Sequence, residues 1–236
     1  MSSANQPRRG LGALMNSTIG AKIGMAVSGV VLVGFVVQHM VFNLQLFLGP
    51  EALNAYAYNL KHLAGGTFVW IGRAFLLGML VLHVATAIRL KARNQAARPQ
   101  PYAAGQRFLA TSYAARFMLF TGVVVLLFLA YHLAHFTLGL VMADNFHVVD
   151  AQGRHDVWRM VVQGFRVPLV TATYVLANVA LAFHLSHSVT SMFETLGLRA
   201  GRYRKAIDAV GPAVALFVFA GNFAMPVAVL AGLVHL

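Results

Sequence analysis

The chain has 236 residues, of which 59% are apolar and only 10% are charged. Soluble domains usually have about 25% charged residues, so this composition excludes an ordinary soluble fold. The formal net charge is +12 at pH 7. The sequence contains no cysteine, which excludes disulfides and a cysteine-held iron–sulfur cluster within this chain.

Five apolar blocks predict five membrane-spanning helices, at residues 22–48, 67–92, 113–142, 165–193 and 207–234. A helix needs about 20 residues to cross the hydrocarbon core, so blocks of this length indicate tilt or projection beyond the bilayer. We expect a polar tail at residues 1–20 and a single all-α domain, a five-helix bundle, at residues 21–236. Between the spans we expect a short amphipathic helix at 49–66, a loop at 94–112, and a longer loop at 144–164.

The basic residues gather on one side of the predicted spans. Thirteen of the 18 lie there: Arg8, Arg9, Lys22, Arg89, Lys91, Arg93, Arg98, Arg107, Arg116, Arg199, Arg202, Arg204 and Lys205. The positive-inside rule therefore places the N-terminus in the cytoplasm and the C-terminus outside. This topology accounts for the net charge without nucleic-acid binding. A basic cytoplasmic face suits anionic lipid or a soluble protein partner, and charge alone does not separate the two.

Each of the first four apolar blocks has a histidine deep in its apolar run: His39, His83, His132 and His184. An imidazole in hydrocarbon is costly unless something holds it. At a rise of about 1.5 Å per residue, His39 and His132 lie about 25 to 28 Å from the cytoplasmic start of their spans, whereas His83 and His184 lie about 14 Å from the inner surface. The pattern predicts two layers, His83 with His184 near the cytoplasm and His39 with His132 near the outside.

Two histidines from different helices at one depth suit a haem, whose iron takes one imidazole nitrogen at each axial position. Two layers therefore predict two haems b. The alternative is that each histidine hydrogen-bonds a neighbouring carbonyl group, an explanation that suits one membrane histidine better than four paired in depth. His135 and His187 each follow a predicted ligand by three residues on the same helix face, so either is an alternative ligand.

The residues around these histidines resemble a known family. The matching segments are Ser28-Gly29, Phe35-Val-Val-Gln-His39-Met40-Val-Phe-Asn43, Gly49-Pro-Glu-Ala-Leu-Asn54, Leu82-His83, Ala114-Ala-Arg116, Thr121-Gly122, Tyr131-His132-Leu-Ala-His135 and Phe183-His184-Leu-Ser-His187. They resemble the cytochrome b558 subunit of succinate dehydrogenase, the type B dihaem membrane anchor of succinate:quinone oxidoreductases. The similarity covers nearly the whole chain, and the segments of the first and fourth spans are the most specific.

The resemblance implies a five-helix transmembrane bundle that encloses two haems b in a bacterial cytoplasmic membrane. It implies two partners, a flavoprotein with FAD and the dicarboxylate site, and an iron–sulfur protein on the cytoplasmic face. Electrons from succinate would reach a proximal haem held by His83 and His184, then a distal haem held by His39 and His132, and then a quinone, which is often menaquinone in similar proteins. Fumarate reduction reverses this path. The anchor itself performs no dicarboxylate chemistry, and a higher oligomer of the complex is compatible with the sequence.

One departure from the family concerns proton transfer. Dihaem fumarate reductases of this type carry an acidic residue two positions before the proximal ligand on the fourth span, and here that position is Ala182. They also carry an outer glutamate near the quinone, with which Glu51 does not align well. The resemblance therefore does not extend to the transmembrane proton path of those fumarate reductases.

Several polar residues are candidates for cofactor contacts. Arg73 and, more weakly, Arg166 are candidates for the propionates of the distal haem, and Ser28 and Arg116 for those of the proximal haem. Arg73 alternatively extends to the outer interface, and Ser28-Gly29 and Gly122 alternatively let helices approach closely. Asn43 and Gln45 are candidate quinone neighbours.

Two other functions are compatible with the sequence. One is a dihaem cytochrome b of another membrane oxidoreductase, of the hydrogenase or formate dehydrogenase type, whose histidines usually have different spacing. The other is a haem-free membrane anchor or transporter whose histidines relay protons or bind substrate. An optical spectrum distinguishes the second from any haem protein.

Overall fold

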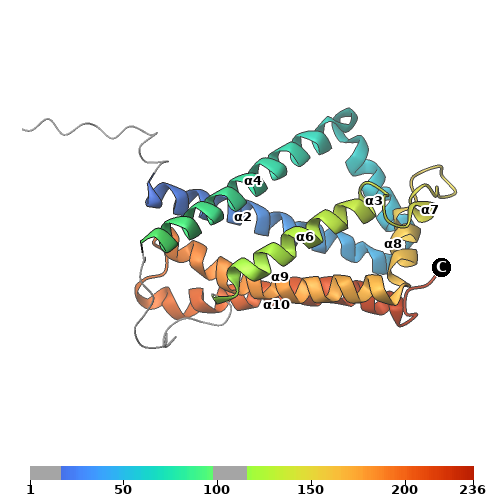
Figure 1. Cartoon of the computed structure of the whole chain (residues 1–236). Helices are drawn as coiled ribbons and strands as arrows, with labels where there is room; N and C mark the ends of the chain where they lie inside the picture. The colour runs from blue at the N-terminus through green and yellow to red at the C-terminus, as the bar shows by residue number, and fades with distance from the viewer. Residues whose placement is uncertain (1–16, 98–115) are drawn as a thin grey trace, which may run out of the picture.

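The computed structural model describes residues 17–97 and 116–236, and within these ranges it contains helices and no strand. Five helices are long and apolar enough to cross a membrane. They are α2 (Thr18–Asn43), α4 (Thr67–Ala96), α6 (Met118–Phe136), α9 (Pro168–Thr195) and α10 (Arg204–Leu230). Figure 1 shows them running along one bundle. All five predicted spans are therefore confirmed as helices, while most of the predicted tail and of the 94–112 loop lies outside the described residues.

The third spanning helix is shorter than the apolar block that predicts it. We expected it to end at residue 142, but α6 ends at Phe136. Gly139 has φ +64°, a conformation that glycine adopts easily, and the Leu138 N–H donates to the Leu133 carbonyl at 2.8 Å. The chain therefore turns out of the helix while its sequence is still apolar.

The predicted loop at 144–164 is wrong in part, because it contains two helices, α7 (Ala143–Phe146) and α8 (Val157–Phe165). The Asp156 side chain caps α8 by accepting from the Arg159 N–H at 3.0 Å. Met160, Val162 and Phe165 are buried, so α8 packs one apolar face onto the bundle. Polar residues at 150–156 made this segment resemble a loop throughout.

The amphipathic helix predicted after the first span is confirmed as α3 (Pro50–His62), between the short helices η1 (Leu44–Leu48) and η2 (Leu63–Gly66). Asn54, which is 1% exposed, joins it to α8: its amide donates to Asp156 at 3.0 Å and its carbonyl accepts from the Trp158 N–H at 2.9 Å. The Trp158 indole N–H donates to the Leu46 carbonyl at 3.0 Å. These bonds tie α3 and α8 across one end of the bundle, which we call the α3–α8 end.

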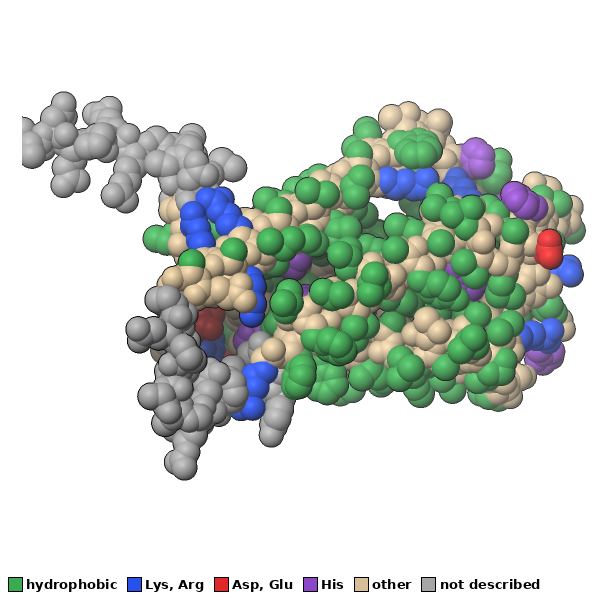
Figure 2. All heavy atoms as spheres, in the orientation of Figure 1, with side chains coloured by type: hydrophobic (Ala, Val, Ile, Leu, Met, Phe, Trp, Pro, Cys, Tyr) green, Lys and Arg blue, Asp and Glu red, His purple; other side chains and the backbone are tan. Residues whose placement is uncertain are grey.

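The opposite end carries the starts of α2, α6 and α10 and the ends of α4 and α9, as Figure 1 shows. Its described basic residues are Lys22, Arg89, Lys91, Arg93, Arg116, Arg199, Arg202, Arg204 and Lys205. We call it the basic end, and the blue side chains at the left of Figure 2 mark it. The side of the membrane that it faces stays a prediction.

The bundle is packed unevenly. Helices α9 and α10 are in close contact, and Gly211 permits this approach. A Cβ at Gly211 would collide with the Ser186 carbonyl and the Thr190 hydroxyl. Likewise a Cβ at Gly221 would collide with Met40 of α2. By contrast, α4 packs against α2 with a single buried residue, Thr86, so most of this helix is exposed or half-buried. Figure 2 shows a hollow between α4 and α6 in which histidine side chains are visible.

Candidate functional site

The four membrane histidines meet in two pairs, in the combination that the sequence predicts. His83 of α4 lies beside His184 of α9, with ring centroids 6.4 Å apart and ring planes at 64°. His39 of α2 lies beside His132 of α6, with ring centroids 5.8 Å apart and ring planes at 89°. Along their helices, His83 and His184 are nearer the basic end and His39 and His132 nearer the α3–α8 end. Four helices thus supply one histidine each.

Both ring separations suit a single metal between two imidazoles. A metal about 2 Å from each ligating nitrogen places the ring centroids about 6 Å apart. Among the described residues no group of three or more His, Cys, Asp or Glu comes together. Pairs match the two axial positions of a haem iron, whereas a structural zinc usually takes about four protein ligands. The donor set therefore fits haem.

A hydroxyl group lies beside each ring of the pair nearer the basic end. The Ser28 Oγ of α2 is 3.3 Å from His83 Nδ1, and the Thr121 Oγ1 of α6 is 3.3 Å from His184 Nδ1. Ser28 is 0% exposed and Thr121 is 5% exposed. Ser28 is a propionate candidate from its sequence, but this placement favours contact with the His83 ring instead.

A glycine follows each of these hydroxyl residues and lies close to a histidine ring. A Cβ at Gly122 would lie 3.4 Å from the Cε1 atom of His184, and one at Gly29 would lie 3.8 Å from that of His83 and collide with the sulfur of Met192. The sequence analysis missed the role of Thr121. The repeated hydroxyl–glycine dipeptide, in spans that each face a histidine, is the signal that would have found it.

Tyr174 of α9 organises the second pair. Its hydroxyl lies 3.3 Å from His132 Nδ1 and 3.2 Å from His135 Nδ1. The sequence analysis missed Tyr174, which has no distinctive neighbours in the sequence. His39 has a different neighbour, because its ring stacks on Phe35 with centroids 5.4 Å apart.

The structure also separates the alternative ligands. His135 is 2% exposed, and its ring stacks on that of Phe136 with centroids 3.9 Å apart. Its Nε2 atom faces Gly164, where an added Cβ would lie only 3.2 Å away. Protein therefore encloses the nitrogen that a metal would need. His132, not His135, lies beside His39, and His184, not His187, lies beside His83. This arrangement favours His132 and His184 as ligands.

The arginines considered for propionates are all exposed. Arg73 lies over the ring of Trp70, with its Cζ atom 5.0 Å from the ring centroid. That cation–π contact suits a side chain at a membrane interface. Arg166 follows α8 as its C-cap, and Arg116 lies just before α6 at the basic end.

The quinone candidates lie near the α3–α8 end. Asn43 is the last residue of α2 and Gln45 lies in η1, and both side chains are half-buried. They follow His39 by one to two turns, so they share its end of the bundle. The structure thus places them on the side of the His39–His132 pair.

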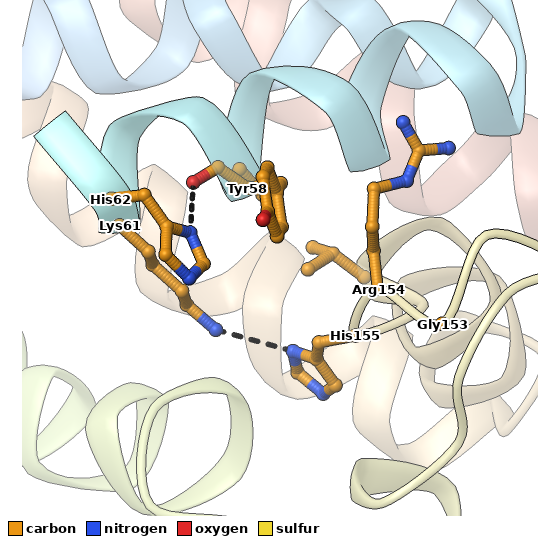
Figure 3. A pocket seen from close by; sticks show the side chains of 8 residues that line it. Tyr58, Lys61, His62, Gly153, Arg154 and His155 are labelled. Atoms are coloured by element: carbon orange, nitrogen blue, oxygen red, sulfur yellow. Dashed lines mark hydrogen bonds between the residues drawn. The ribbon is translucent and has the colours of Figure 1, made fainter.

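A separate cavity of about 210 Å³ opens at the α3–α8 end between α3 and the 153–157 segment (Figure 3). The Lys61 Nζ lies 3.3 Å from His155 Nδ1, and the His62 ring stacks on Tyr58 at 4.0 Å. Burial, together with the nearby Lys61 charge, lowers the pKa of His155. The Lys61 ammonium group can only donate, so His155 Nδ1 accepts at this contact. None of the paired histidines lines this cavity.

The same end carries an ion-pair network. Arg154 pairs with Glu51 at 2.7 Å and with Asp150 at 2.8 Å. Glu51, which does not align well with the outer glutamate of the family, is therefore held by an arginine. The network links α3 to the 150–154 turn.

A scan against protein-family models, a search of curated proteins and a search of solved structures each gave no match to this chain.

Proposed function

We propose that this chain is the cytochrome b membrane-anchor subunit of a succinate:quinone oxidoreductase, a succinate dehydrogenase or fumarate reductase. It would pass electrons between an iron–sulfur subunit and a membrane quinone through two bis-histidine haems b. The observation that carries the proposal is the pairing of four histidines from four spanning helices at 5.8 and 6.4 Å. The motifs around them supply the choice of enzyme.

The histidines would act as axial ligands: His83 and His184 for the haem nearer the basic end, and His39 and His132 for the haem nearer the α3–α8 end. A bound haem supplies one-electron transfer between ferric and ferrous iron. Both imidazoles of each pair would be used to hold the haem, which suits electron transfer rather than catalysis on it. Apolar residues such as Phe35 and Phe128 lie against the second pair and limit water there.

The rest of the molecule supports this division of work. The basic end suits docking of the iron–sulfur subunit on the cytoplasmic face, with the flavoprotein and its FAD beyond it, and also suits contact with anionic lipid. Asn43 and Gln45 lie toward the opposite end, where a quinone, menaquinone in many similar proteins, would accept electrons. The chain would contribute electron transfer and quinone chemistry, while the dicarboxylate site lies in a partner.

Succinate-dependent reduction of haem b in membranes that contain the chain and its partner subunits tests this proposal. Addition of succinate should produce the reduced α-band of haem b, and malonate should suppress it. Formate and hydrogen serve as parallel donors. Reduction by one of these and not by succinate would assign the chain to another oxidoreductase, and a spectrum without haem b would support the haem-free anchor or transporter.

A further inference from the structure

The two rings of the pair nearer the basic end are held in the same way by different helices. Each hydroxyl donates to the carbonyl four residues earlier on its own helix, Ser28 Oγ to Gly24 at 2.7 Å and Thr121 Oγ1 to Phe117 at 3.0 Å. Each oxygen also lies 3.3 Å from the Nδ1 atom of the facing histidine. The sequences that carry them, Ser28-Gly29 and Thr121-Gly122, have the same order of hydroxyl and glycine.

Proton counting fixes the state of the rings. A hydroxyl group has one proton, and the backbone carbonyl takes it, so the oxygen can only accept at its contact with the ring. Nδ1 must therefore carry the ring proton. Each neutral ring then presents the lone pair of Nε2 on its other side.

We propose that Ser28 and Thr121 are positioning residues that select the Nε2-ligating tautomer of His83 and His184 and set the redox potential of the haem that this pair holds. This inference rests on the proposed function. An Nδ1–H that donates to an acceptor makes the imidazole a stronger electron donor to a metal. Stronger donation favours ferric iron over ferrous iron and so lowers the potential. The His39–His132 pair has a different partner, the Tyr174 hydroxyl, which lies 3.3 Å from His132 Nδ1 and would not change in these variants.

Variants that delete each hydroxyl test the inference. Ser28→Ala and Thr121→Val remove the acceptor, and Thr121→Ser retains it. Thr173→Val is a matched control, because the half-buried Thr173 of α9 donates to the carbonyl of Leu169 at 2.8 Å in the same way. Redox titration of the purified complex resolves the two haems, which His184→Ala and His132→Ala assign by removing one each.

We expect the potential of the His83–His184 haem to rise in Ser28→Ala and Thr121→Val. Loss of an outer partner of a ligand typically changes metal binding by about tenfold to 100-fold. Because each variant leaves the other hydroxyl in place, we expect about threefold to tenfold in the ratio of ferric to ferrous binding, where tenfold is about 59 mV for one electron. Thr121→Ser, Thr173→Val and the potential of the second haem should match the wild type.

Three results would overturn this inference and leave the proposed function intact. Haem could be present with neither potential changed, both potentials could change equally, or the potential of Thr121→Ser could shift as far as that of Thr121→Val. Absence of haem from the wild type would instead overturn the proposed function. If Ser28→Ala does not accumulate, the comparison of Thr121→Val with Thr121→Ser decides the matter, because both replace a single buried side chain on α6.

Discussion

At the scale of single residues, the choice of ligand depends on which ring nitrogen is accessible. His132 and His135 share the Tyr174 hydroxyl through their Nδ1 atoms, so hydrogen bonding does not distinguish them. Their Nε2 atoms do, because that of His135 faces Gly164 and the ring of Phe136, whereas His132 lies beside His39.

This difference predicts the outcome of four alanine substitutions. His132→Ala and His184→Ala should each lower the haem content from two per chain to one, because each removes an axial ligand of a different haem. His135→Ala and His187→Ala are matched controls three residues away and should retain both. Haem content per purified chain measures the effect. Loss of haem in His135→Ala with retention in His132→Ala, or in His187→Ala with retention in His184→Ala, would reverse the assignment of ligands.

At the scale of elements, glycine has opposite effects at different places in the bundle. Gly211→Ala should destabilise the fold by about 1 to 3 kcal/mol, because its Cβ would meet the backbone carbonyl of Ser186 where α9 and α10 touch. Gly72→Ala is the control: a Cβ there has nothing within 4 Å, and alanine favours a helix over glycine by about 1 kcal/mol. Thermal unfolding in detergent should show a lower midpoint for Gly211→Ala only. Equal midpoints would contradict the close packing of these helices.

The 150–154 turn, which the ion-pair network links to α3, should respond to acid. Desolvation alone would raise the pKa of the Asp150 carboxyl, but hydrogen bonds from Arg154 and Gln152 outweigh it and hold the pKa below its ordinary value. A carboxyl whose pKa is lower in the folded state stabilises that state above its unfolded pKa, and the benefit is lost as pH falls through the folded value. We therefore expect the turn to loosen below about pH 4.

Trp158 reports on this turn, because its N–H is bonded to Asn54, which also contacts Asp150 and Asp156. In a Trp70→Phe background, its fluorescence should be steady from pH 7 to pH 5 and change at lower pH. Asp150→Asn should lack the part of that change that comes from this carboxyl. An unchanged acid transition in Asp150→Asn would show that other groups cause it.

The spanning helices could be predicted because hydrophobic length alone determines them, and the histidine pairs because topology sorts residues by depth. The end of α6 and the presence of α8 could not, since they depend on the conformation of Gly139 and on the cap at Asp156. Thr121 and Tyr174 were missed for a related reason. Their role comes from packing between helices, because Thr121 of α6 contacts His184 of α9 and Tyr174 of α9 contacts His132 of α6. A hydrophobicity pattern carries no information on which side chains meet.

At the scale of the whole molecule, the distribution of charge predicts the orientation in the membrane. The basic end should face the cytoplasm. Because the chain has no cysteine, single introduced cysteines report on each side without background labelling. In intact cells an impermeant maleimide should label Gln152→Cys, which lies at the exposed α3–α8 end, and should label Leu198→Cys only after lysis. Labelling of Leu198→Cys in intact cells would reverse the topology.

The two layers of histidines are the central claim, and the haem content of the purified chain tests them most directly. A pyridine haemochrome assay, scaled to protein by amino-acid analysis, should give two haems b per chain, because each pair of imidazoles would hold one iron. A preparation that is folded and contains no haem would contradict the account.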